Sequence, residues 1–100
     1  MAIPERFSEY RCSEYFASFT QGVWSEEEQM WLIVRADEVC ERPESEFLVV
    51  GRAGVDGIEF GYRRGQDGLW AHHPIDNDFT HVAPTVQALV DNWLAGRIAV

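Results

Sequence analysis

The chain has 100 residues, of which 46% are hydrophobic, so residues 1–100 are expected to form one domain with one packed core. No apolar run approaches the roughly 20 residues of a membrane-spanning helix, and no basic segment followed by an apolar one opens the sequence, so we expect a cytoplasmic protein without membrane contact. The net charge of −9 argues against nucleic-acid binding, because an acidic surface repels phosphate, and it favours solubility or the attraction of a basic partner.

The first third of the sequence predicts a helix, an acidic segment and a buried strand. Residues 4–19 open with a proline, which suits a first helical turn, and carry aromatic side chains near helical spacing. Residues 25–28, a serine and three glutamates, fit either the capped start of a helix or an exposed acidic turn before the next strand. Residues 30–34 are continuously apolar and too short for a helix, which favours a largely buried strand.

The middle of the sequence predicts the sheet around which the domain forms. Residues 37–42 favour one or two helical turns that end before Pro43, because the residue before a proline avoids the helical region. Three β-prone runs follow, separated by turns rich in Gly and Asp, a pattern typical of antiparallel strands joined by hairpins. These runs are residues 47–50, 58–62 and 69–74, and residues 79–82 favour a last strand.

The C-terminal helix has the clearest pattern in the sequence. Thr85 is a candidate N-cap, and Gly96 lies where a left-handed residue often ends a helix. The apolar stripe between them is expected to pack on the sheet, and consists of Val86, Leu89, Val90, Trp93 and Leu94. The order of elements predicts an α+β fold, in which N-terminal and C-terminal helices pack on one side of an antiparallel meandering sheet.

The sequence shows no catalytic signature. Its serines, cysteines and histidines lie outside motifs such as G-x-S-x-G, and its glycines between residues 51 and 68 form no phosphate-binding loop before a helix. Cys12 and Cys40 match no metal-ligand spacing and are expected to be buried, reduced thiols, with a disulfide as the less favoured alternative. We therefore predict a protein that is not an enzyme and has no cofactor.

Histidines and aspartates near the end of the predicted sheet raise the alternative of a metal-binding or small-molecule module. The candidate residues are His72, His73, Asp76 and His81, because imidazole and carboxylate groups bind metals. His72 and His73 point to opposite faces if they lie in a strand, and the spacing of the set matches no established zinc or calcium loop. A polar strand end followed by a turn is the favoured interpretation of this segment.

Aromatic and acidic side chains outside the predicted core indicate a protein-binding surface. Trp31 and Trp93 fit the core, whereas Trp24 and Trp70 lie in polar surroundings where partial exposure is expected. Aromatic residues ringed by charge are typical of protein interfaces. The predicted partner-binding residues are Trp24, Glu26, Glu27, Glu28, Asp56, Glu59 and Trp70. A further alternative is a structural subunit of a larger complex, or a homodimer that closes through a sheet edge or an aromatic surface.

Several segments of the sequence resemble the SUKH superfamily, which includes fungal cell-wall-synthesis regulators and many bacterial immunity proteins. The similar segments are the apolar strand and Gly/Asp-rich turn of residues 47–60, Leu69-Trp70, the helix after Thr85, Ile3-Pro4 with Phe7, and Trp31-Leu32 followed by Asp37-Glu38-Val39. The glycine cluster departs from the family pattern at Arg52, Ala53 and Val55, and the N-terminal region is shorter than usual.

The SUKH resemblance implies a fold and a function. The fold is an α+β binding domain without catalytic residues. In bacteria such a domain often neutralises a toxin, frequently a nuclease, by binding and covering it. An acidic chain suits this role, because a nuclease surface that holds nucleic acid is basic.

Overall fold

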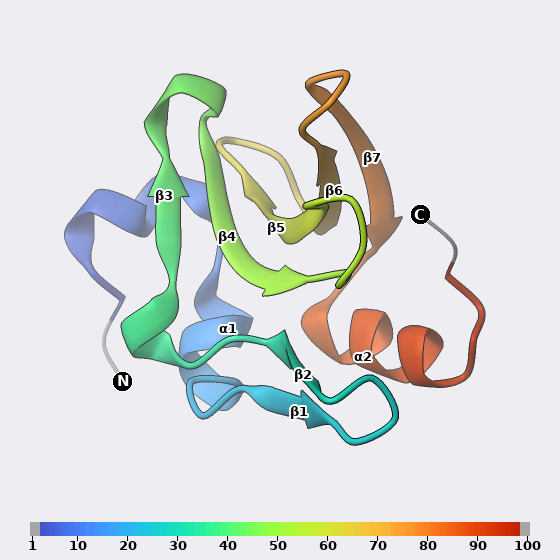
Figure 1. Cartoon of the computed structure of the whole chain (residues 1–100). Helices are drawn as coiled ribbons and strands as arrows, with labels where there is room; N and C mark the ends of the chain where they lie inside the picture. The colour runs from blue at the N-terminus through green and yellow to red at the C-terminus, as the bar shows by residue number, and fades with distance from the viewer. Residues whose placement is uncertain (1–2, 99–100) are drawn as a thin grey trace.

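In the computed structural model, which describes residues 3–98, seven antiparallel strands form one sheet with helical segments against one of its faces (Figure 1). The predicted α+β class is confirmed. The strands are β1 (Val23–Ser25), β2 (Met30–Ile33), β3 (Cys40–Arg42), β4 (Phe47–Arg52), β5 (Glu59–Arg63), β6 (Leu69–His73) and β7 (Asp78–Ala83). The helices are α1 (Ser13–Ser18) and α2 (Val86–Leu94), with 3-10 turns η1 (Glu5–Tyr10), η2 (Ala36–Glu38) and η3 (Pro43–Ser45).

The predicted central strands form a meander in which β4, β5, β6 and β7 each pair with the next strand along the chain. On the other side of β4 the sheet divides. Strand β3 pairs along the first half of β4, whereas β2 meets β4 only where Ile33 lies opposite Gly51. The β1–β2 hairpin is therefore joined to the sheet at one end only, and Figure 1 shows it projecting below the strongly bent β4.

The single helix predicted over residues 4–19 is wrong in its middle. Arg11 has φ +53°, in the left-handed region, which ends η1 and lets α1 begin in a new direction. A left-handed Arg costs about 1–2 kcal/mol relative to a right-handed one. The break lets aromatic side chains from both short helices enter the core, and these are Phe7, Tyr10, Tyr15 and Phe16. Their aggregate burial outweighs the local cost.

Two other polar segments are settled by the structure, one within the predicted alternatives and one against prediction. Of the two possibilities for residues 25–28, the structure adopts the acidic turn, which joins β1 to β2. Residues 37–42 contain only the single turn η2, after which β3 pairs with the apolar β4. Strands β1 and β3 have three residues each and mixed polarity, so neither has an alternating pattern long enough to be seen in the sequence.

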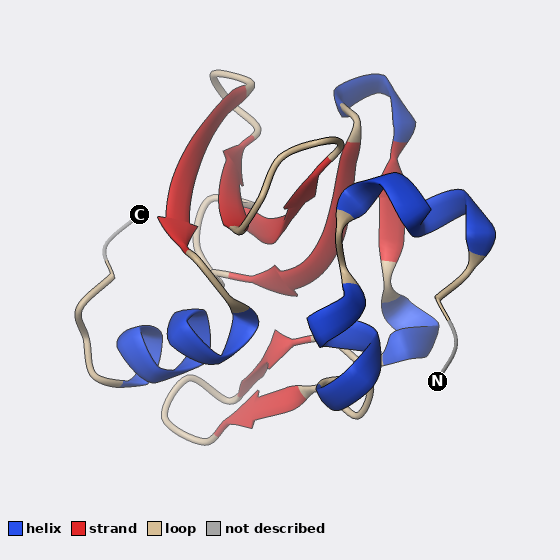
Figure 2. Cartoon of the chain, turned by 180° about the vertical axis from the view of Figure 1, so that it is seen from behind, coloured by secondary structure: helices blue, strands red, loops and turns tan. Residues whose placement is uncertain are grey.

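The two faces of the sheet have different surroundings. One face packs on η1, α1 and α2, which lie on the near side of the sheet in Figure 2. The other face is concave, because β4 bends at a bulge between Val49 and Gly51. Phe47 and Val49 are buried on this concave face. Gly61 allows the tight curvature, since a Cβ at this position would lie 2.0 Å from the Leu48 carbonyl oxygen.

The C-terminal helix begins and ends as predicted. Thr85 Oγ1 accepts a hydrogen bond from the Ala88 N–H at 3.0 Å, and Gly96 has φ +73° after the helix. The predicted apolar stripe is buried at three of its five positions, but Leu94 is 51% exposed and Trp93 is half-buried. Among residues 3–98, no helix has the length and apolarity to cross a membrane.

Candidate functional site

The β1–β2 hairpin presents an aromatic pair to solvent. Trp24 lies directly opposite Trp31 in the strand register, and their ring centroids are 5.4 Å apart with planes at 76°. Alternation along β1 turns Ser25 into the core and leaves Trp24 42% exposed. The ring of Trp31 lies against Gly22, where a Cβ would come within 3.0 Å of it. Trp31, predicted as a core residue, is therefore half-buried and supports Trp24.

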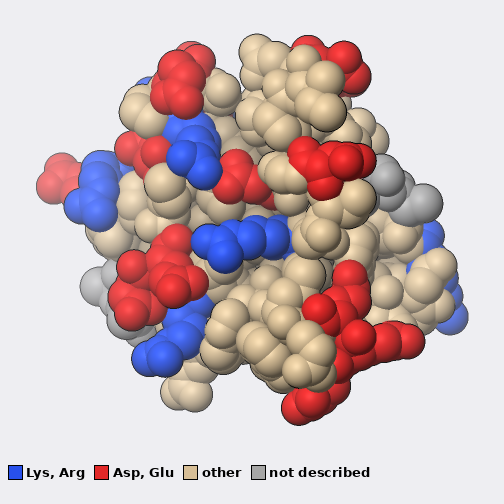
Figure 3. All heavy atoms as spheres, in the orientation of Figure 1, with Lys and Arg blue, Asp and Glu red and all other residues tan. Residues whose placement is uncertain are grey.

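The turn of this hairpin carries the densest acidic sequence in the chain. Glu26, Glu27 and Glu28 are exposed, and Figure 3 shows acidic side chains gathered over the lower right of the molecule, where the hairpin ends. Ser25 Oγ accepts a hydrogen bond from the Glu28 N–H at 3.3 Å, which stabilises the turn. Among residues 3–98, Glu26 and Glu27 form no ion pair, so their charges face solvent.

Glu28 has a structural role that the sequence did not indicate. Its carboxylate accepts a hydrogen bond from the Trp93 indole N–H of α2. This contact, together with the approach of the Met30 side chain to Gly54, joins the hairpin to the helix and to the β4–β5 turn. Val55, next to Gly54, is 45% exposed. We call Trp24, Glu26, Glu27, Glu28, Trp31 and Val55 the hairpin surface.

The other predicted partner-binding residues do not all join the hairpin surface. Asp56 is exposed in the β4–β5 turn beside Val55. Glu59 lies on the concave face instead, where its Oε2 accepts a hydrogen bond from Arg42 Nη2 at 2.8 Å. Trp70 is also on the concave face, in edge contact with His81. Four of the seven predicted residues thus belong to the hairpin surface, one lies beside it and two lie on the concave face, because they come from different strands and turns.

The structure divides the candidate metal ligands in the same way. His72 and His81 lie on the concave face, and His72 Nε2 is 3.0 Å from Asn77 Oδ1. His73 is on the other face, where it lines a depression of about 200 Å³ with Asp56 and Asp76. Within the described part of the chain, no three His, Cys, Asp or Glu side chains are placed to hold a metal ion. The metal hypothesis therefore has no ligand set in residues 3–98.

The cysteines and tyrosines outside these surfaces have structural surroundings. Burial raises the pKa of the Cys12 thiol, which keeps it protonated. Both cysteines are free thiols as expected, but the expectation that Cys40 is buried is wrong, because its side chain on β3 is exposed. Burial, with a smaller effect of the Asp37 charge, raises the pKa of Tyr15 to about 12. Its hydroxyl donates a hydrogen bond to the Val34 carbonyl at 2.7 Å. Cys12 and Tyr15 therefore hold their protons firmly and stabilise the core.

No protein-family model, no curated protein and no solved structure matches this chain. The hairpin surface is therefore interpreted from its own chemistry. It combines an exposed indole, an aromatic ring that supports it and two carboxylates without a counter-charge. Such a surface suits contact with a protein that presents basic side chains, since aromatic groups supply contact area and carboxylates supply attraction.

Proposed function

We propose that this chain is a non-enzymatic protein-binding domain that uses the hairpin surface to bind and cover a basic protein partner. The single observation that carries the proposal is the exposed Trp24, held over Trp31 and followed by the unpaired Glu26 and Glu27. The SUKH resemblance supports the same proposal and suggests the partner's class, a nuclease-type toxin that the domain neutralises as an immunity protein.

The two parts of the hairpin surface have different roles in this proposal. The ring of Trp24 already rests on Trp31, so a partner can bury it at little further cost in side-chain entropy. Exposed carboxylates mainly increase the association rate, because charge on a rim acts on the encounter more than on the final complex. We therefore expect Trp24 to control the dissociation rate, and Glu26 and Glu27 to control the association rate.

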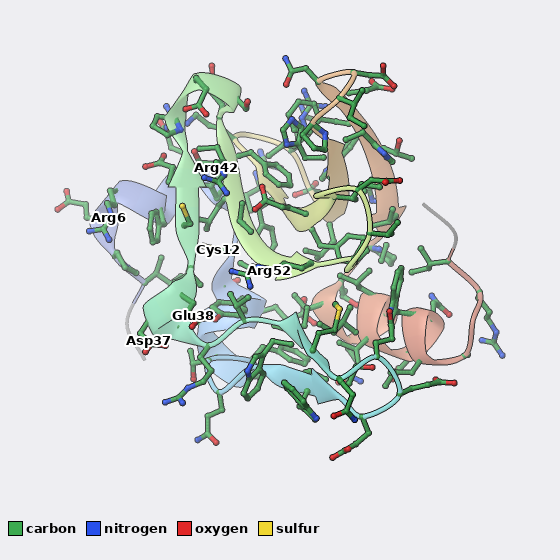
Figure 4. All side chains as sticks on the ribbon, in the orientation of Figure 1. Arg6, Cys12, Asp37, Glu38, Arg42 and Arg52 are labelled. Atoms are coloured by element: carbon green, nitrogen blue, oxygen red, sulfur yellow. The ribbon has the colours of Figure 1, made fainter. Side chains whose placement is uncertain are left out.

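The test is capture of partners from the source cells with purified variants as bait. The informative variant is Glu26→Arg with Glu27→Arg, which leaves Glu28 and its bond to Trp93 intact. The matched control is Asp37→Arg with Glu38→Arg, an adjacent exposed pair with the same charge change, labelled in Figure 4 at the other end of the molecule. We expect the native chain and the control to retain one basic protein, less at higher salt, and the hairpin variant to lose it.

Two results would contradict the proposal. Equal retention by all three baits would place the contact outside the hairpin surface. Recovery of no protein, or of this chain alone, would favour self-association in place of a basic partner. Trp24→Ala extends the test to the retained complex, where loss of a central aromatic side chain costs about 2 kcal/mol or more, roughly a thirtyfold weaker affinity.

A further inference from the structure

The concave face holds an arginine whose charge has no carboxylate partner among residues 3–98. Arg63 is the last residue of β5 and is half-buried. Its guanidinium lies 4.3 Å from the ring centroid of Phe79 and 5.0 Å from that of Trp70. Phe79 is in turn held by Phe47 and by the stacked ring of His72, at 5.4 and 4.8 Å. The aromatic side chains thus hold this guanidinium in place.

The remaining arginines of the chain show why Arg63 is unusual. Three of them form ion pairs with carboxylates, namely Arg11, Arg42 and Arg64. Four others are exposed, so water can satisfy their donors, namely Arg6, Arg35, Arg52 and Arg97. Arg63 alone is half-buried without a side-chain hydrogen bond or an ion pair among residues 3–98. A partly desolvated guanidinium without an acceptor is costly, and a bound acceptor would remove that cost.

A depression of about 320 Å³ lies at the end of β5, where Arg63 is one of its lining residues. The other lining residues are Ser45, Gln66, Arg64, Glu44 and Glu46. Arg64 is already paired with Glu9, Glu41 and Glu46, so Arg63 is the cation there with free donors. Glu44 and Glu46 repel a bound anion in proportion to the charge of that anion. They therefore disfavour a phosphate dianion more than a carboxylate monoanion.

We propose that Arg63 is the recognition group of a binding site for a carboxylate. The planar guanidinium presents paired N–H donors that match the two oxygens of a carboxylate, as in a bidentate arginine–carboxylate pair. Ser45 and Gln66 supply further hydrogen-bonding groups around the depression. The site lies at the end of β5 and shares no residue with the hairpin surface, so its test is independent of the proposed function.

The experiment compares two small probes by NMR of the full chain at pH 7. N-acetylphenylalanine carries a carboxylate, and N-acetylphenylalanine amide is the same molecule without the charge. We expect the carboxylate probe to shift the Arg63 Nε–Hε and Trp70 indole N–H signals along a saturable curve, and the amide to shift neither. Inorganic phosphate at equal ionic strength should bind more weakly. Equal shifts with the amide, or tighter binding of phosphate, would overturn the carboxylate assignment.

Variants of this site complete the test. Arg63→Gln should abolish saturable binding, and Arg63→Lys, which keeps the charge without the planar fork, should weaken it about tenfold or more. Arg97→Gln removes the same charge from an exposed position and should leave binding unchanged. Retained binding in both Arg63 variants, with well-dispersed spectra, would overturn the proposal. If Arg63→Gln does not fold, the Lys variant decides.

Discussion

The N-terminus of helix α2 allows a specific prediction about stability, because a residue distant in sequence accepts hydrogen bonds from two of its backbone N–H groups. Glu14, in α1, accepts hydrogen bonds from the N–H groups of Val86 at 2.7 Å and Gln87 at 3.2 Å. The next two N–H groups bond to the side-chain and carbonyl oxygens of Thr85. The Leu89 bond is the first regular bond of the helix, so the three donors before it that the helix leaves open are satisfied, two of them by the Glu14 carboxylate.

The size of the effect follows from these contacts. Hydrogen bonds to a charged group contribute about 1.5–3 kcal/mol, and a carboxylate at a helix N-terminus adds about 0.3–1 kcal/mol. Because the Gln87 bond is long and exposed, we expect Glu14→Ala to lower the free energy of unfolding by about 2 kcal/mol. Thr85→Ala removes one neutral cap and should cost about 1 kcal/mol. The Glu14 loss corresponds to a fall in Tm of about 8–16 °C.

Urea denaturation of the native chain and the variants measures these differences. Glu5→Ala is the control, since Glu5 is an exposed acid without a hydrogen bond or an ion pair in the described residues, and should change stability by less than about 0.5 kcal/mol. Glu14→Gln keeps one acceptor oxygen and should fall between the native chain and Glu14→Ala. A Glu14→Ala loss no greater than that of Glu5→Ala would refute this account of how α2 is held.

Three other predictions follow from the core. Gly61→Ala should lower the free energy of unfolding in urea by about 3 kcal/mol, because the added Cβ would meet the Leu48 backbone. Gly65→Ala should cost about 1 kcal/mol, because this glycine has φ +72° but lies in open space. Similar losses for the two variants would contradict the close approach at Gly61. Tyr62→Phe should change stability by less than about 0.5 kcal/mol, since its buried hydroxyl has no hydrogen-bond partner among residues 3–98. Tyr15→Phe should cost about 1 kcal/mol, because it removes the bond to the Val34 carbonyl, and the reverse order would be inconsistent with the structure. Burial raises the pKa of both tyrosines, that of Tyr15 to about 12, so the unfolded chain loses these protons at lower pH than the folded chain. Stability should therefore fall as the pH rises above about 10. A urea midpoint that stays constant or rises between pH 8 and 11 would contradict this prediction.

The sequence predicted the elements whose patterns are long and regular. Strands β4 to β7 and helix α2 were predicted because apolar periodicity, turn glycines and the Thr85 cap act locally. The break at Arg11 was not predicted, because it depends on how two aromatic pairs share one core. Strand β3 was missed for a similar reason: its polar residues pair with an apolar neighbour that only the tertiary fold provides.

The candidate site was predicted in part for the same physical reasons. The exposure of Trp24 and of its neighbouring glutamates followed from local polarity. The sequence could not show that Glu59 pairs with Arg42 or that Trp70 lies under Arg63, because strand register decides both contacts. The support of Trp24 by Trp31 also depends on register. The sequence could not single out Arg63 as a binding residue, because only the folded structure shows that no carboxylate among residues 3–98 pairs with it.

The central claim is that a basic partner meets the hairpin surface, and the association rate constant of the captured partner tests it most directly. At about 0.1 M salt the Debye length is about 10 Å, so a charge change affects the rate mainly where the partner binds. We predict that Glu26→Arg with Glu27→Arg slows association at least about tenfold. Asp37→Arg with Glu38→Arg should change it less than about twofold. Equal slowing by both pairs, or no slowing by the hairpin pair, would contradict the claim.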